Sequence, residues 1–174
     1  MRGAKSLGLA TILALAMPVA GSAQNSAVSG DWQTVNHDLA ATRCSPLDQI
    51  NKSNVSQLAL KWSYPMKASN TAAPVVVNGV MYFPAGNRVV ALDADSGQEI
   101  WSYQPAAVGP APGTSGRGSG FSARGLGYWP GDGKLGPRLL VIAGDKLVAI
   151  DAKTGQPASG FGEGGAVAID PSYG

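Results

Sequence analysis

One segment of the chain occurs twice, and this internal repeat restricts the fold more than any other feature. Asn87–Trp101, NRVVALDADSGQEIW, returns in altered form as Asp145–Ser159, DKLVAIDAKTGQPAS, with matching positions 58 apart. Each copy starts with alternating apolar residues, which predict a strand, and continues with Asp-x-x-Ser/Thr-Gly, which predicts a turn. Repeated units of this kind bury a shared core only when they stack. Each copy is therefore predicted to lie in a four-stranded β-propeller blade.

Further strands are predicted around the first copy. Residues 75–77 precede Asn78-Gly79, a dipeptide that favours a type I′ turn, and the apolar run resumes at Val80. With the strand that follows at residues 100–103, one complete blade can be read from the sequence.

The regions that flank this blade are less regular. Residues 139–143 and 146–150 predict two strands of a second blade, which is expected to end in a loop at Phe161–Gly165 without a closing strand. Upstream, Ser53-Asn54 is a possible cap for a short helical turn. The alternation of Leu58, Leu60 and Trp62 then predicts a strand with one buried face.

Composition agrees with an all-β chain. The 174 residues include 24 glycines and 12 prolines, but only 14% are charged, which suits many short strands joined by tight turns. A closed propeller needs at least four blades of roughly 40–45 residues each, more than this length provides. The predicted fold is therefore all-β, an incomplete β-propeller. The Pro- and Gly-rich residues 105–120 are either a linker or a loop that crosses one face of the propeller.

The first 23 residues have the pattern of a signal peptide. Arg2 and Lys5 precede the apolar residues 7–20, and small residues occupy positions 21–23. The alternative, a membrane anchor, is less favoured because a bilayer needs roughly 20 apolar residues. We expect residues 1–23 to be removed on export and residues 24–174 to form the propeller domain.

Charge and cysteine content exclude some functions. Without Arg2 and Lys5, eleven basic residues balance eleven acidic ones, and the basic residues are scattered, so no nucleic-acid partner is expected. Cys44 is the single cysteine and cannot form an internal disulfide. It is predicted to be a half-buried small residue.

Short motifs occur in a fixed order along the chain. They are Asp31-Trp32, Arg43-x-Ser45-Pro46-Leu47-Asp48-Gln49-Ile50-Asn51, Ala73-Pro74-Val75, the Ala-Leu-Asp-Ala-x-Ser-Gly-x-x-x-Trp blade motif, Arg124-Gly125, Tyr128-Trp129-Pro130-Gly131-Asp132-Gly133 and Gly160-Phe161-Gly162-Glu163-Gly164-Gly165. With these motifs, essentially all of residues 24–174 resembles the pyrroloquinoline quinone (PQQ)-dependent dehydrogenases of the bacterial periplasm. The last motif is similar to the branch that oxidises glucose, other sugars or polyols.

The resemblance implies an architecture and an activity. Members of the family form an eight-bladed propeller, bind PQQ and Ca²⁺ on its axis, take a hydride from an alcohol or sugar and pass electrons to ubiquinone or a cytochrome. This chain would supply about two blades from the N-terminal part of the ring. Without the missing C-terminal blades, little or no activity is expected. The implied location is the periplasm, with association with the inner membrane left open.

The resemblance also implies which residues contact the cofactor. Arg124 matches an arginine that contacts the quinone, and its planar charged fork suits a carboxylate or carbonyl pair. Thr71 occupies the position of a cofactor-binding glutamate in many members. Gly118, Ser119 and Gly120 stand where members have adjacent cysteines or a histidine. The Ca²⁺ ligands and the catalytic aspartate are expected beyond Gly174, so no catalytic or metal-binding residue is assigned here.

Other polar residues have structural explanations. Asp93 and Asp151 are each expected to cap the backbone of the repeated turn, and the lone His37 is expected to be structural. The competing hypothesis for the whole chain is a non-enzymatic propeller scaffold, of the type that assembles outer-membrane proteins. It explains the blade repeat equally well, but it does not explain the motifs at residues 124–133 and 160–165.

Overall fold

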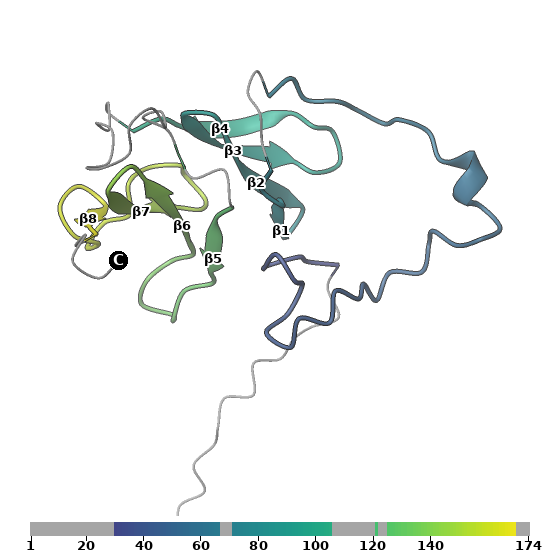
Figure 1. Cartoon of the computed structure of the whole chain (residues 1–174), viewed down its shortest axis with the longest axis horizontal. Coiled ribbons are helices and arrows are strands. Elements are labelled where there is room, and N and C mark those ends of the chain that lie inside the picture. Colours follow the sequence, from purple (N-terminus) through teal and green to yellow (C-terminus); the bar gives the residue numbers. More distant parts are fainter. Residues whose placement is uncertain (1–29, 67–70, 106–120, 122–124, 170–174) are drawn as a thin grey trace, which may run out of the picture.

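The described part of the chain contains two four-stranded antiparallel sheets (Figure 1). The structure is a computed structural model, which describes residues 30–66, 71–105, 121 and 125–169. Sheet A contains, in spatial order, β1 (Val75–Val77), β2 (Val80–Ala85), β3 (Arg88–Asp93) and β4 (Glu99–Tyr103). Sheet B contains β5 (Gly127–Trp129), β6 (Arg138–Ala143), β7 (Lys146–Asp151) and β8 (Ala166–Ala168). The prediction of an all-β, incomplete propeller is confirmed.

The predicted repeat is a structural repeat. Tyr82 pairs with Ala91 between β2 and β3, and Leu140 pairs with Ala149 between β6 and β7. Both pairs differ by the same 58 positions as the sequence repeat. The four strands of sheet A follow the prediction, since Asn78 and Gly79 have φ angles of 51° and 75°, as the tight turn between β1 and β2 requires.

Sheet B corrects the sequence analysis at both of its edges. No closing strand was expected, yet β8 pairs with β7 from Lys146↔Ala168 to Val148↔Ala166. The inner strand β5 also lies where only glycine-rich aromatic packing was predicted. Both strands have three residues, too few for a periodic pattern to reveal them, and their partner strands supply the hydrogen bonds that define them.

The main core lies between the two sheets. One face of each sheet contributes alternate residues to it, as the two-residue period of a strand requires. Its buried members include Val75, Val77, Tyr82, Val89 and Ala91 of sheet A and Leu139, Val141, Ala143, Val148 and Ile150 of sheet B. The opposite face of sheet A has a second, smaller cluster built from Phe83, Ala85, Val90 and Leu92.

A tryptophan joins sheet A to sheet B. The Trp101 indole of β4 donates from Nε1 to the Ala152 carbonyl at 3.2 Å. The ring lies against Gly155, where an added Cβ would be 2.6 Å from the indole Cδ2. The Tyr82 hydroxyl donates to the same Ala152 carbonyl, also at 3.2 Å. Gly155 has φ of 71°, so glycine satisfies both the turn and the close approach of the ring.

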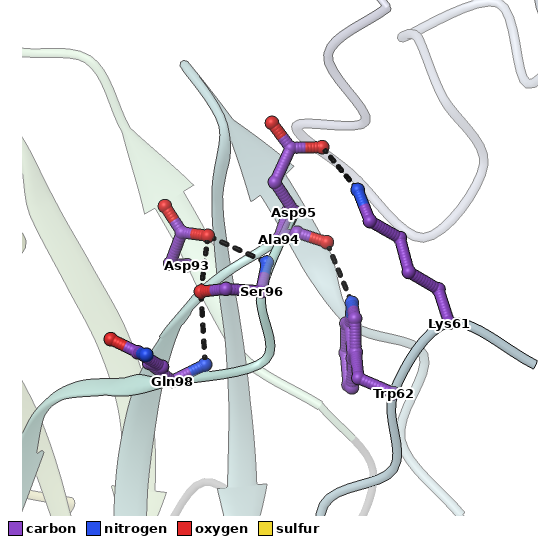
Figure 2. A network of polar contacts seen from close by, with 7 residues as sticks. All are labelled: Lys61, Trp62, Asp93, Ala94, Asp95, Ser96 and Gln98. Atoms are coloured by element: carbon purple, nitrogen blue, oxygen red, sulfur yellow. Dashed lines mark hydrogen bonds and ion pairs between the residues drawn. The ribbon is translucent and has the colours of Figure 1, made fainter.

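The repeated turn is built as predicted. Asp93 Oδ1 accepts hydrogen bonds of 2.7 Å from both the backbone nitrogen and the hydroxyl of Ser96 (Figure 2). The hydrogen bonds to Ser96 lower the pKa of the Asp93 carboxyl. In the second copy, Asp151 Oδ1 accepts from the backbone of Thr154 at 2.9 Å. The capping role predicted for both aspartates is confirmed.

The segment before sheet A differs from its prediction. A 3₁₀ turn, η1 (Val55–Gln57), is present, but Asn54 makes no side-chain cap bond to it. The following residues are extended without being assigned to a strand, and Leu58 and Leu60 are 60% and 84% exposed. The predicted buried face is therefore wrong at these two leucines.

One further prediction is wrong, and two others lie outside the described residues. Cys44 is exposed, so the prediction that it is half-buried is wrong. Residues 1–23 and most of the 105–120 segment lie outside the described residues, so the signal peptide and the linker-or-loop alternative stay predictions. Among the residues that are described, no helix is long and apolar enough to cross a membrane.

Candidate cofactor-binding site

Both predicted cofactor contacts precede an innermost strand. Thr71 comes four residues before β1, and Arg124 comes three residues before β5. β1 and β5 have the same place in their sheets, so Thr71 and Arg124 precede equivalent strands in the sequence. Thr71 is exposed. Arg124 lies outside the described residues, so its side chain is not placed.

The N-terminal segment lies along the free edge of β1. Asp31 Oδ1 accepts a hydrogen bond of 2.9 Å from the Asn78 backbone, at the end of the strand. Trp32 and Val76 then exchange two backbone hydrogen bonds, of 2.7 and 3.0 Å, as an antiparallel bridge. The segment therefore runs from the end of β1 towards its beginning (Figure 1).

Gly125 lies two residues before β5 and close to Val35 of the N-terminal segment. Its φ is 121°, which residues with side chains rarely adopt, and an added Cβ would be 4.0 Å from Val35 Cγ2. The next residue, Leu126, is buried in the core between the sheets. The backbone directly after Arg124 is thus fixed by a glycine conformation and by an anchored leucine.

The loop after Val35 is held by local contacts. The His37 ring packs against Trp32, with ring centroids 4.8 Å apart, and its Nδ1 is 3.5 Å from Asp38 Oδ2. The pKa of Asp38 is lowered, mainly by the hydrogen bond from the Thr42 hydroxyl at 2.6 Å. Arg43 Nε donates to Asn36 Oδ1 at 2.9 Å and closes the loop. His37 here packs and positions the loop, which agrees with the structural role expected for it.

The described residues can meet only part of the chemistry of PQQ. PQQ is a planar quinone with three carboxylates, and of the two predicted contacts only Thr71, whose side chain carries a hydroxyl, lies among the described residues. No group of three or more His, Cys, Asp or Glu side chains that could hold a metal occurs in the described ranges. The described residues therefore include no candidate Ca²⁺ site, and the quinone contacts at Thr71 and Arg124 stay predictions.

Sequence analysis missed one repeated tripeptide. Trp62-Ser63-Tyr64 is identical to Trp101-Ser102-Tyr103, and Trp62 docks on sheet A as Trp101 docks on sheet B. Its 39-residue separation differs from the 58-residue repeat, so an alignment at one fixed period does not reveal it. A search for identical tripeptides would have found it.

A family model matches residues 32–174. Its description is "Glucose/ethanol/alcohol dehydrogenase, beta-propeller domain", with PQQ as the family name. The chain belongs to this family. The recognition of a PQQ-dependent dehydrogenase propeller is confirmed.

Individual relatives agree with the family. The chain is 39% identical over 142 residues to the quinohemoprotein alcohol dehydrogenase of Comamonas testosteroni, which covers 76% of this chain and 18% of that protein. It is 39% identical over 138 residues to the 1-butanol dehydrogenase (cytochrome c) of Thauera butanivorans, covering 78% and 19%. The chain therefore spans about a fifth of the length of these relatives.

Parts of two solved structures are also similar to this chain. The crystal structure of the Comamonas testosteroni enzyme matches with a TM-score of 0.56 at 36% identity, over 76% of this chain and 19% of that one. A europium-containing methanol dehydrogenase matches with a TM-score of 0.57 at 32% identity, over 72% and 22%. These relatives are named as alcohol or methanol dehydrogenases, so the sugar branch indicated by residues 160–165 stays a prediction.

The residues that suggested a sugar substrate have a structural explanation. A Cβ at Gly162 would collide with the Ala166 carbonyl, and one at Gly165 would be 2.7 Å from the Pro157 Cβ. Both glycines have positive φ, at 52° and 82°. Glycine is therefore needed at these positions to return the chain to β8, whatever the substrate.

Proposed function

We propose that this chain supplies two neighbouring blades of a PQQ-dependent dehydrogenase that oxidises an alcohol. The observation that carries the proposal is the identity of 35–39% to alcohol dehydrogenases of this type over about three quarters of the chain. The two four-stranded sheets, which share a buried core, support it. In this proposal residues 1–23 are an export signal and the mature protein works in the periplasm.

Two residues are proposed to hold the cofactor. The guanidinium of Arg124 would bind a carboxylate or the carbonyl pair of PQQ through its fork of N–H donors. The Thr71 hydroxyl would donate one hydrogen bond where a glutamate could only accept. The bound quinone supplies the chemistry, since it accepts the hydride that leaves the alcohol carbon. Ca²⁺ and the base that takes the hydroxyl proton are assigned to parts of the propeller outside the described residues.

The electron acceptor is proposed from the relatives. One is named for cytochrome c, and the alcohol dehydrogenase subunit of Gluconobacter oxydans is named for a quinone. A cytochrome or ubiquinone is therefore the proposed partner of this protein. For the substrate, a small primary alcohol is favoured over glucose because residues 160–165 have a structural role.

Quinone binding is the first test. The chain is titrated with PQQ in the presence of Ca²⁺, and binding is followed by the change in quinone absorbance. Arg124→Ala is expected to weaken binding at least about tenfold, as loss of a charge-assisted hydrogen bond implies. Lys153→Ala removes a positive charge from an exposed turn of sheet B and is the matched control. Equal affinity of the two variants would show that Arg124 does not contact the quinone.

Activity is tested in a longer protein. The part of the Comamonas testosteroni enzyme that this chain matches is replaced by the chain, and dye reduction is measured with ethanol, 1-butanol and glucose. Oxidation of the alcohols but not of glucose is expected. A preference for glucose would favour the sugar branch, and a folded chimera that does not bind PQQ would favour the scaffold hypothesis.

A further inference from the structure

The turn between β1 and β2 contains a dipeptide that can react with itself. Asn78 is the only asparagine of the 174 residues that is directly followed by glycine. The backbone nitrogen after an asparagine can attack the side-chain carbonyl carbon of that asparagine, and a side chain on the attacking residue hinders the approach. Because glycine has no side chain, the attack is least hindered in an Asn-Gly sequence. The turn is therefore a candidate site of spontaneous modification.

The structure leaves both reacting groups accessible. Asn78 and Gly79 are exposed. Among the described residues, none forms a hydrogen bond with the Asn78 side-chain amide or with the Gly79 backbone nitrogen. An added Cβ at Gly79 would meet no atom within 4 Å, so the solvent side of the turn has room for a cyclic imide.

The reaction needs no reagent other than water. The Gly79 nitrogen forms a bond to the side-chain carbonyl carbon of Asn78, the bond from that carbon to the amide nitrogen breaks, and ammonia leaves with the Gly79 amide proton. Water then adds to one of the two carbonyl carbons of the imide and breaks its bond to the Gly79 nitrogen. Opening at the main-chain carbonyl gives isoaspartate, and opening at the other carbonyl gives aspartate. No atom is oxidised or reduced.

Two other exposed turns lack one of the requirements. Asp132-Gly133 has the glycine, but Asp132 Oδ1 accepts hydrogen bonds from the backbone nitrogens of Leu135 and Lys134 at 2.8 and 2.9 Å. These bonds lower the pKa of the Asp132 carboxyl, and an ionised carboxylate has no leaving group. Asn87 is exposed, but the next residue, Arg88, carries a side chain and begins β3.

The second repeat excludes the reaction at the equivalent position. The Gly79 carbonyl accepts a hydrogen bond from the Ala94 nitrogen at 2.9 Å, and the Pro137 carbonyl accepts one from the Ala152 nitrogen at 3.0 Å. Both acceptors and both donors are 58 positions apart, as in the repeat. Proline has no backbone N–H, so no imide can form through Pro137. The reactive dipeptide is thus specific to sheet A.

The same turn holds the N-terminal segment. The Asn78 backbone nitrogen donates to Asp31 Oδ1 at 2.9 Å. The next residue, Trp32, forms the two-bond bridge with Val76 on the free edge of β1. The position and charge of residue 78 therefore affect the first contact of this segment with the sheet.

Isoaspartate would change both contacts of the turn. Its free carboxylate is on the Cα of residue 78, beside the nitrogen that donates to Asp31, so two carboxylates would repel each other there. Its main chain also includes the former side-chain methylene, which displaces the Gly79 carbonyl from the Ala94 nitrogen. We propose that Asn78 is a site of spontaneous deamidation and that the isoaspartate formed releases the N-terminal segment from β1. This inference depends on neither the substrate nor the cofactor proposed above.

Ageing of the purified chain tests the site. The chain is kept at neutral pH and physiological temperature, and samples are digested and analysed by mass spectrometry with electron-transfer fragmentation, which distinguishes isoaspartate from aspartate. The peptide that contains residue 78 is expected to gain about 1 Da well before the peptides that contain Asn51 and Asn87. It is also expected to accept a methyl group in an isoaspartyl methyltransferase assay.

Hydrogen exchange tests the release. The modified fraction is separated from the unmodified chain by ion exchange, because it carries one more negative charge. The amides of Trp32 and Val76 are expected to exchange about two- to tenfold faster in the modified fraction, the factor that corresponds to loss of one hydrogen bond. The amides of β7 in sheet B are the internal reference and should not change.

Two variants provide controls. Asn78→Gly removes the reactive amide and keeps the tight turn, since Gly-Gly also suits type I′. It should not be modified at this turn, and its Trp32 amide should exchange at a constant rate throughout the incubation. Asn87→Gly makes the matched change in the next exposed turn of sheet A and should leave modification of residue 78 at the unaltered rate.

Three results would overturn the proposal. The first is an unmodified Asn78 in the folded chain after a time in which an isolated peptide of residues 75–82 is fully converted. The second is isoaspartate at residue 78 with unchanged exchange at Trp32 and Val76, which would show that the segment stays bound. The third is equally faster exchange in aged Asn78→Gly, because the cause would then lie elsewhere in the chain.

Discussion

The carbonyl of Ala152 accepts two hydrogen bonds at the junction of the sheets, and this arrangement predicts a measurable coupling. Tyr82 and Trp101 each donate to it at 3.2 Å, and Ala152 is only 2% exposed. In Tyr82→Phe the carbonyl keeps the indole donor, so the variant loses one hydrogen bond, worth about 0.5–1.5 kcal/mol. In Trp101→Phe it keeps the tyrosine donor.

The double variant is predicted to lose more unfolding free energy than the two single variants lose together. Without both donors the buried carbonyl has no side-chain hydrogen bond left, which costs a further penalty of about 1–3 kcal/mol. The altered ring packing of Trp101→Phe is present in both the single and the double variant, so it cancels from the coupling energy. The expected coupling is therefore at least about 1 kcal/mol, with the double variant the less stable.

Urea unfolding followed by far-ultraviolet circular dichroism measures this coupling without relying on tryptophan fluorescence. Trp62→Phe combined with Tyr82→Phe is the matched control, because Trp62 donates to a different carbonyl, that of Ala94. The control pair should be additive within about 0.5 kcal/mol. Additivity of Tyr82→Phe with Trp101→Phe would refute the shared-acceptor reasoning.

Three more predictions follow from the turns and the titrating groups. Gly155→Ala combines positive φ with a contact of 2.6 Å to an indole, so it should lower the unfolding free energy by about 3 kcal/mol. Gly133→Ala also has positive φ but no atom within 4 Å, so it should lower the unfolding free energy by only about 1 kcal/mol. Thermal unfolding of both variants measures the difference. Burial raises the pKa of Tyr82 to about 12, so the folded state holds the proton longer than the unfolded state. Stability should fall by about 3 kcal/mol as pH rises from about 10 to 12, and Tyr82→Phe should show a flatter alkaline limb. The pKa of Glu99 is lowered, chiefly by the hydrogen bond from Tyr64, so its contribution is present above its usual pKa and is lost as pH falls. An acid limb unchanged in Glu99→Gln would contradict that role.

The sequence predicted the parts of the fold whose signals are local. Alternating apolar residues and the Asn78-Gly79 turn predicted the strands of sheet A. The 58-residue repeat then predicted β7 as the equivalent of β3. β5 and β8 were missed because each has three residues and owes its conformation to the neighbouring strand. A pattern within one segment does not contain that information.

Burial was predictable only where the partner surface belongs to the same stretch of chain. The alternation at Leu58, Leu60 and Trp62 was recognised, but only Trp62 finds a surface, on sheet A. Leu58 and Leu60 find no such surface among the described residues and are 60% and 84% exposed. Likewise, Arg124 was assigned by resemblance, since no spacing or charge pattern distinguishes it from another arginine in a glycine-rich sequence.

The order in which the junctions can form follows from where their halves lie in the chain. Trp62 is synthesised 35 residues before Gly97 and Trp101 is synthesised 54 residues before Gly155, so each indole leaves the ribosome before the turn that receives it. At ordinary rates of translation the delay is on the order of 2–10 s. During that time each indole lacks the glycine turn that will cover it. The contact of Trp62 with Gly97 can therefore form before the contact of Trp101 with Gly155.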